Sequence, residues 1–132
     1  PGRIAFLSGG IGITPIRSMC KYAVDKQTEH DIVLLYANRT PEDIAFKDDF
    51  DAMQQASSRI KVVHVLCEAT NEFSCVSGRI SGTVIQQQVP DYPERKFYLC
   101  GPPPMVEAMK KILGEELRVG EANIITENFQ GY

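Results

Sequence analysis

Three glycines within four positions follow the first apolar run of the chain. Gly9, Gly10 and Gly12 lie in the segment SGGIGITP, residues 8–15. Glycines let backbone N–H groups approach a phosphate closely, and the N-terminus of a following helix adds a partial positive charge. The segment therefore predicts a phosphate-binding turn. The alternative is a tight turn between a strand and a helix that binds no ligand.

This turn departs from two common nucleotide-binding motifs. In the fingerprint G-x-G-x-x-G, a third glycine would stand where this chain has Pro15. The second apolar run ends in Asn38, Arg39 and Thr40, without the acidic residue that accompanies the fingerprint. A P-loop would need Gly-Lys followed by Ser or Thr. The turn therefore matches neither the usual dehydrogenase signature nor a P-loop.

Two further segments carry residues that suit chemistry at a sheet edge. CGPPPM, residues 100–105, follows the fourth apolar run, and on its own it predicts a core cysteine followed by a helix start. The last six residues, ENFQGY, include Phe129 and Tyr132. Exposed aromatic side chains at a domain edge suggest a missing partner surface. A tail folded back on its own core is the alternative.

Apolar runs of strand length alternate with amphipathic helical patterns along the whole chain. The predicted strands span residues 3–8, 31–38, 59–67, 96–100 and 122–126, and the predicted helices span residues 14–27, 46–57, 81–88 and 102–117. Residues 68–78 are polar and predicted to be irregular. The alternation indicates an α/β fold, with a parallel sheet covered by helices on both faces. Ligands of such sheets bind beyond the carboxyl ends of the strands.

Composition and charge exclude several classes of protein. The 132 residues are 43% hydrophobic and 23% charged, which is ordinary for one globular domain spanning residues 1–132. The net charge of −3 and the scattered basic residues argue against nucleic-acid binding, and no apolar run is long enough for membrane insertion. The four cysteines form no C-x-x-C pair, so we expect no metal site, free thiols and a cytoplasmic location. Because the chain starts with Pro1, we expect it to be a piece of a longer protein.

Taken together, the three segments resemble the nucleotide-binding domain of the ferredoxin–NADP reductase superfamily of flavin oxidoreductases. That domain has a GGxGxxP turn after its first strand, CGPxxM after its fourth and an acid-x-aromatic tail, which correspond here to residues 9–15, 100–105 and 127–129. Residues 36–50 match the tyrosine, arginine and amphipathic helix that follow the second strand of the family. The resemblance covers essentially the whole chain. The expected fold is a five-stranded parallel sheet in the order 3-2-1-4-5.

The resemblance also implies the roles of individual residues. Cys100 would lie beside the nicotinamide C4, and Glu127 would form hydrogen bonds near the junction of nicotinamide and flavin, so both are expected catalytic residues. The expected cofactor-binding residues are Gly9, Gly10, Gly12, Thr14, Pro15, Arg39, Glu68, Gly101, Pro102, Met105, Phe129 and Tyr132. Among them, Phe129 matches the aromatic residue that shields the flavin ring. Relatives that use NADPH carry Ser-Arg where this chain has Cys67 and Glu68, so NADH is expected in preference to NADPH.

The expected function is that of the NAD(P)H-binding module of a flavin-dependent oxidoreductase. The R-x-Y-S/T motif of the family's flavin-binding barrel is missing here, so FAD or FMN would come from an N-terminal domain of the same polypeptide. Electrons would pass on to a protein or iron–sulfur acceptor, and the isolated chain would be inactive. A free-standing nucleotide-binding or regulatory module without electron transfer is the alternative. Flavodoxin-like and response-regulator domains share these layers. A response regulator needs an acidic cluster after the first strand, where this chain has SGG, and a flavodoxin needs a hydroxyl-rich phosphate loop, for which only Thr14 is available.

Overall fold

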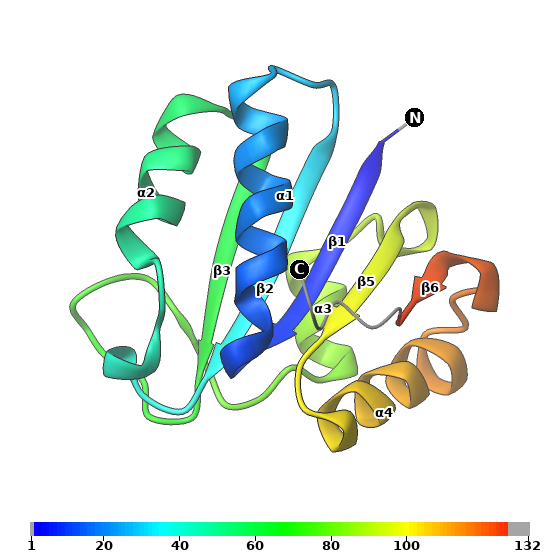
Figure 1. Ribbon diagram of the computed structural model, residues 1–132. Coiled ribbons are helices and arrows are strands. Elements are labelled where there is room, and N and C mark those ends of the chain that lie inside the picture. The colour runs from blue at the N-terminus through cyan, green and yellow to red at the C-terminus, as the bar shows by residue number, and fades with distance from the viewer. Residues whose placement is uncertain (1, 127–132) are drawn as a thin grey trace.

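Parallel strands form one sheet through the centre of the molecule (Figure 1). A computed structural model describes residues 2–126, and within them six strands follow the order β4-β3-β2-β1-β5-β6. The strands are β1 (Arg3–Gly9), β2 (Asp31–Asn38), β3 (Ile60–Leu66), β4 (Val76–Ser77), β5 (Lys96–Cys100) and β6 (Ile124–Ile125). The predicted α/β class and the relative order of the five predicted strands are confirmed. The predicted number of strands is wrong.

The additional strand is β4, at one edge of the sheet and inside the segment predicted to be irregular. Val76 pairs with Val65, and Ser77 pairs with Leu66, so the strand is only two residues long. Alternation of apolar and polar residues needs at least four positions to stand out. A strand of this length therefore leaves no periodic signal in the sequence. The connection over residues 67–75 leads from the end of β3 to this strand.

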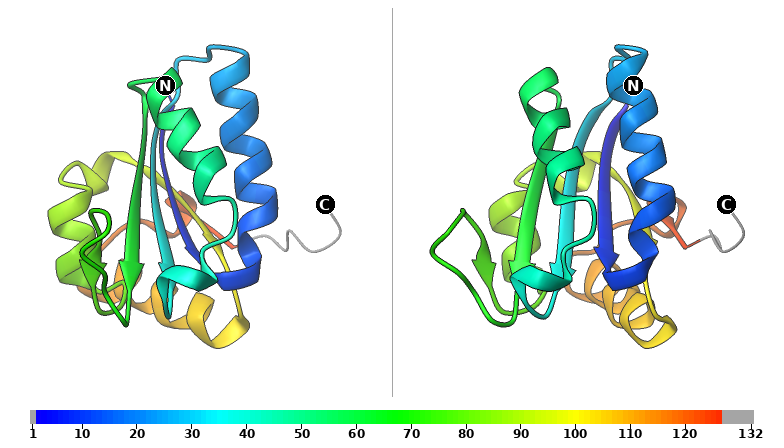
Figure 2. Two further views of the ribbon diagram at one scale, coloured as in Figure 1. Left: turned by 90° about the vertical axis from the view of Figure 1, so that its left-hand side faces the viewer. Right: turned by 60° about the vertical axis from the view of Figure 1, so that its left-hand side comes forward.

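Helices cover both faces of the sheet (Figure 2). Helices α1 (Ile13–Asp25) and α2 (Lys47–Ala56) lie on one face, and α3 (Gly82–Gln88) and α4 (Pro103–Lys111) on the other. Helix α1 begins one residue before its predicted start and has no side-chain cap. Residues 112–116, predicted as the end of the last helix, form a π-helical turn after α4 instead.

The core consists of two apolar layers, one on each face of the sheet. Successive residues of β1 and β2 point into opposite layers, so both strands are buried throughout their central residues. The layer under α1 and α2 contains Phe6, Ile13, Ile16, Cys20, Ile32, Leu34, Tyr36, Phe50, Met53 and Ile60. The opposite layer includes Leu7, Leu35, Val65, Ile85, Phe97, Leu99, Met109 and Leu113. Burial on both faces explains why these strands appear in the sequence as continuous apolar runs.

A buried guanidinium group fastens the amino-terminal edge of the sheet. Arg95 is only 5% exposed and donates hydrogen bonds to the carbonyl oxygens of Ile4 (2.8 Å) and Asp31 (3.0 Å). It also donates to the carboxylates of Asp31 (2.9 Å) and Asp91 (2.8 Å). These bonds satisfy most of its donors, as a buried charge requires. This edge is therefore closed by protein groups, in contrast to the opposite one.

Candidate functional site

A cleft of about 980 Å³ opens at the carboxyl edge of the sheet, the edge toward which the strand arrows point in Figure 2. Its walls come from the turns that follow β1, β2, β3, β4 and β5, and from one side of α4. This is the position at which open parallel sheets bind their ligands. Its volume lies at the upper end of the range of small-molecule and cofactor sites.

The structure gathers about half of the predicted site residues around this cleft. Those that line it are Gly9, Gly10, Thr14, Arg39, Pro102 and Met105. Gly12, Pro15, Glu68 and Gly101 lie next to lining residues in the chain without lining the cleft themselves, and Cys100 lies two residues before the lining residue Pro102. The predicted tail residues Glu127, Phe129 and Tyr132 lie outside the described residues.

The turn after β1 packs directly on the turn after β5. A Cβ atom at Gly12 would lie 2.8 Å from the sulfur of Cys100 and 2.9 Å from the backbone nitrogen of Gly101. Both distances are shorter than a carbon atom tolerates. A Cβ atom at Gly9 would overlap the thioether of Met105. Backbone atoms therefore exclude a side chain at Gly12, whereas at Gly9 the flexible Met105 side chain would have to move.

Gly10 differs from its two neighbours because space surrounds it. Its φ of +56° lies in the left-handed region that favours glycine. No heavy atom lies within 4 Å of the position where a Cβ would stand, although the residue lines the cleft. Helix α1 follows with no side-chain cap and no acidic residue in its first turn. Its N-terminus therefore retains the partial positive charge that attracts anions.

A polar atom at the cleft also lacks a partner. The side-chain nitrogen Nδ2 of Asn38 is buried and has no hydrogen-bond partner within residues 2–126, while the residue lines the cleft. Buried polar groups usually find partners, so such an atom indicates a site where a ligand or water accepts a hydrogen bond. The glycine cradle at Gly10 and this amide both suit a polar, phosphate-bearing ligand.

Cys100 ends β5 beneath the glycine turn, in register with Ser8 of β1. Its side chain is half-buried, and burial raises the pKa of the thiol above its usual value. The thiol is therefore protonated at neutral pH and is a weak nucleophile.

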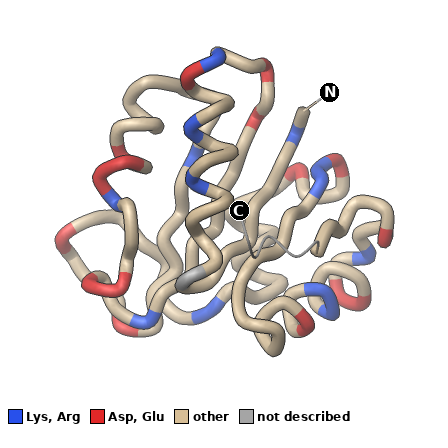
Figure 3. The backbone as a smooth tube through the Cα atoms, viewed as in Figure 1, with Lys and Arg blue, Asp and Glu red and all other residues tan. Residues whose placement is uncertain are grey.

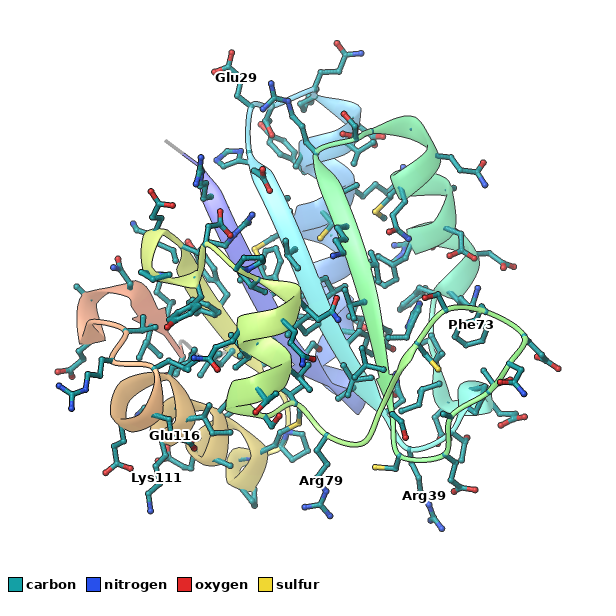
Figure 4. All side chains as sticks on the ribbon, turned by 180° about the vertical axis from the view of Figure 1, so that it is seen from behind. Glu29, Arg39, Phe73, Arg79, Lys111 and Glu116 are labelled. Atoms are coloured by element: carbon teal, nitrogen blue, oxygen red, sulfur yellow. The ribbon has the colours of Figure 1, made fainter. Side chains whose placement is uncertain are left out.

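Two arginines give the cleft its positive charge. The Nε atom of Arg39 lies 3.2 Å from Oε2 of Glu68, and both side chains are largely exposed. Arg79 also lines the cleft, and Figure 4 shows Arg39 and Arg79 extending from the same edge of the sheet. Elsewhere along the backbone, acidic and basic residues are interspersed (Figure 3). Glu68 therefore offsets one of the two cations that face a ligand.

Sequence reasoning missed several residues of the cleft wall. The missed residues include Asn38, Asp43, Phe46, Cys67, Arg79 and Ile80. Arg79 follows β4. Because the sequence does not predict this strand, it does not place Arg79 at the carboxyl edge of the sheet either. The predicted helix over residues 46–57 begins with Phe46, whereas in the structure Phe46 precedes α2 and lines the cleft.

Within residues 2–126, no group of three or more His, Cys, Asp and Glu side chains is placed to hold a metal ion. The same part of the chain has no helix with the length and apolarity needed to cross a bilayer.

The open glycine turn, the uncapped helix and the cleft at the carboxyl edge define a nucleotide-binding α/β domain. Comparison with known proteins gives the family. The model of the oxidoreductase NAD-binding domain matches residues 6–111, so the chain belongs to this family, within the ferredoxin–NADP reductase superfamily. The chain is therefore an oxidoreductase NAD-binding domain.

The relatives are reductases considerably longer than this chain. It is 32% identical over 117 residues to the glycine betaine monooxygenase reductase subunit of Chromohalobacter salexigens, covering 84% of this chain and 31% of that protein. It is 33% identical over 129 residues to NADH-cytochrome b5 reductase 1 of Mortierella alpina, covering 94% and 42%. The cytochrome b5 reductase domain of Ulva prolifera nitrate reductase superposes with a TM-score of 0.81 at 28% identity, covering 93% of this chain and 47% of that one.

The close packing at Gly12 predicts a specific sensitivity to substitution. Gly12→Ala would press a methyl group against backbone atoms of residues 100 and 101, which cannot rotate away. We expect a loss of about 1–3 kcal/mol in the free energy of unfolding, measured by urea denaturation.

The matched control is Gly120→Ala. No heavy atom lies within 4 Å of its Cβ position, and its φ of −63° suits alanine. This variant should stay within about 0.5 kcal/mol of the wild type. Equal unfolding midpoints for the two variants would contradict the packing described here.

Proposed function

We propose that the cleft at the carboxyl edge holds an extended nicotinamide dinucleotide and presents its nicotinamide to a flavin. The observation that carries the proposal is the open left-handed turn at Gly10, which meets the uncapped N-terminus of α1 at the cleft wall. In this arrangement the pyrophosphate accepts hydrogen bonds from backbone N–H groups near Gly10 and Thr14. The amide of Asn38 donates to the same ligand.

The nicotinamide end of the ligand is proposed to lie over β5. Gly12, Cys100 and Gly101 meet there, and the following Pro102 and Met105 border the cleft. When bound, the nicotinamide supplies the hydride chemistry, which belongs to the cofactor. The chain itself orients the ring and excludes water from it. A protonated Cys100 thiol suits contact and positioning rather than covalent attack.

The flavin and the electron acceptor are proposed to lie elsewhere in the complete reductase. The chain spans less than half of each relative described above, which leaves room for a flavin-binding domain that supplies FAD or FMN. One relative is named as a reductase subunit of a monooxygenase, and another as a cytochrome b5 reductase. By analogy, we propose a protein or iron–sulfur acceptor for this chain. Roles for Glu127 and for Phe129 or Tyr132 at the flavin remain predictions from the resemblance.

The 132-residue chain should fold alone, bind NADH and remain colourless. Its two apolar layers support independent folding, and the cleft has the glycine turn for a dinucleotide, whereas a flavin barrel is proposed to reside in another domain. Calorimetry measures NADH binding, and a visible spectrum detects flavin. Absence of NADH binding would contradict the proposal, and a yellow protein that oxidises NADH unaided would contradict the division between domains.

We propose NADH as the preferred cofactor, with Glu68 as the discriminating residue. Its carboxylate repels a 2′-phosphate and forms an ion pair with Arg39. Of the two cleft arginines, Arg79 is then the one that would still attract the phosphate. The wild type should bind NADH about tenfold more tightly than NADPH. Glu68→Gln removes the repulsion and releases Arg39, so this ratio should fall.

Calorimetric titration of both nucleotides measures the ratio. Glu72→Gln, which removes an exposed carboxylate from the same connection, should leave it unchanged. Tighter binding of NADPH than NADH by the wild type would contradict the assignment.

Cys100→Ala tests the proposed positioning role. In the reductase reconstituted with its flavin domain, we expect flavin reduction to slow by about tenfold to a hundredfold while NADH affinity stays nearly unchanged. Rapid-mixing absorbance measures the rate. Cys75→Ala, at a half-buried thiol that does not line the cleft, is the control and should leave the rate unchanged. A covalent adduct on Cys100 during turnover would exclude a purely positioning role.

A further inference from the structure

His64 is a buried histidine for which neither the family resemblance nor the proposed function gives a role. It lies near the end of β3, and only 5% of it is exposed. Neither of its ring nitrogens has a hydrogen-bond partner within residues 2–126. A neutral imidazole carries one donor and one acceptor, whereas a protonated one carries two donors and a charge. This environment therefore favours the neutral ring, because burying an unpaired charge costs far more than burying a neutral polar group.

Two aromatic rings lie against this imidazole. Tyr36 of β2 is paired with His64 in the sheet, and the centroids of their rings are 5.9 Å apart. Phe73 meets the imidazole edge to face, with 5.5 Å between the centroids. Phe73 is half-buried and belongs to the β3–β4 connection (residues 67–75), where Figure 4 labels it. The imidazole therefore joins the sheet to a segment outside it.

The contact between these rings attaches the middle of the β3–β4 connection to the sheet. The connection starts with two backbone hydrogen bonds, in which the amides of Cys67 and Glu68 donate to the carbonyl oxygens of residues 38 and 39, at 3.3 and 2.8 Å. Further along, the amide of the exposed Glu72 and the thiol of Cys75 both donate to oxygen atoms of Thr70, so these bonds stay inside the connection. The position of the middle segment therefore depends on the aromatic contact.

The charged groups that act on His64 come from α2. Lys47 and Asp51 form an ion pair there, with 2.7 Å between Nζ and Oδ2, and the Lys47 ammonium also lies 4.5 Å from the centroid of the Phe73 ring. The titratable group on β2 is the Tyr36 hydroxyl, which is hydrogen-bonded to backbone groups just before α2. Burial lowers the pKa of His64 below its usual value, Lys47 acts in the same direction, and Asp51 opposes them. The ring is therefore neutral at neutral pH.

We propose that His64 is a pH-sensitive switch: its neutral ring holds the β3–β4 connection against the sheet, and protonation releases the connection. This segment begins with Cys67, which lines the cleft, and Glu68, which forms an ion pair with Arg39. Release therefore loosens one wall of the cleft in acid. This consequence for the cofactor rests on the proposed function, whereas the release itself does not.

The direction of the pH dependence follows from the two environments of the ring. Once the connection is released, the imidazole reaches water and has the ordinary histidine pKa of about 6.5. Packed against Phe73, His64 has a lower pKa. The packed connection is therefore fully favoured above about pH 6.5, and this stabilisation is lost as the pH falls from there through the lowered pKa.

Hydrogen exchange of the nucleotide-free chain tests the switch directly. Between about pH 7.5 and about pH 5.5, the protection factors of the hydrogen-bonded amides of Glu68, Glu72 and Gly78 should fall by at least about fivefold. Protection factors already remove the intrinsic pH dependence of exchange, so this fall measures opening. Amides of β1, in the centre of the sheet, should keep their protection, which distinguishes local release from global unfolding.

Two substitutions assign the effect to the ring contact. His64→Phe keeps an aromatic ring and removes the titratable group, so protection should be equal at both pH values. Phe73→Ala removes the contact at a half-buried position, so the domain stays folded and the connection should be weakly protected at both pH values. His30→Gln, at an exposed histidine, is the matched control and should keep the pH dependence of the wild type.

Titration with NAD⁺, which withstands acid better than NADH, measures the effect on the cleft. The wild type should bind NAD⁺ about fivefold more weakly at the lower pH, and His64→Phe should bind it equally at both. A pH-dependent protection that persists in His64→Phe, or an NAD⁺ affinity of the wild type that is the same at both pH values, overturns the inference. If the wild type binds no NAD⁺ at either pH, the proposed function fails, whereas the exchange measurement still decides the switch.

Discussion

The close contact between the turn after β1 and the turn after β5 determines the shape of this domain's functional edge. Gly12 lies so near to Cys100 and Gly101 that no side chain fits between them. This contact joins the two central strands of the site at their carboxyl ends and fixes where α1 and α4 begin. Gly10 lies two residues before this contact, with open space around it at the cleft wall.

The sheet behind these turns is built to be rigid. Its central strands are buried on both faces, and its amino-terminal edge is closed by Arg95 through hydrogen bonds to β1, to β2 and to Asp91. Burial by itself opposes ionisation of Asp91, but the hydrogen bond from Arg95 and the charges of Arg95 and Arg3 hold the pKa of that carboxyl below its usual range. Its contribution to stability is therefore present above the usual Asp pKa and is lost as the pH falls through the lowered one. At the amino-terminal edge, polar groups are thus hydrogen-bonded within the protein, whereas the carboxyl edge has an open cleft.

Much of this fold could be predicted because the strands are continuous apolar runs separated by amphipathic helices. The fold class and the order of the five predicted strands depend on that pattern and on the family resemblance. Strand β4 could not be predicted, because two residues carry no periodicity. The glycine turn could be found because several glycines together are unusual. Phe46 could not, because its spacing to Phe50 matches a helix face while its backbone is left-handed. Local patterns describe buried faces well but do not show where a helix begins relative to a cleft.

The central claim is that the dinucleotide binds at the carboxyl edge, across the turns after β1, β2 and β5. The most direct test is a titration of the isotope-labelled chain with NADH, followed by the amide resonances of each residue. The account predicts the largest shifts at Gly10, Thr14 and Gly101, with Arg95 and Gly120 unchanged. Shifts concentrated at the Arg95 edge, or no shifts at saturating NADH, would contradict it.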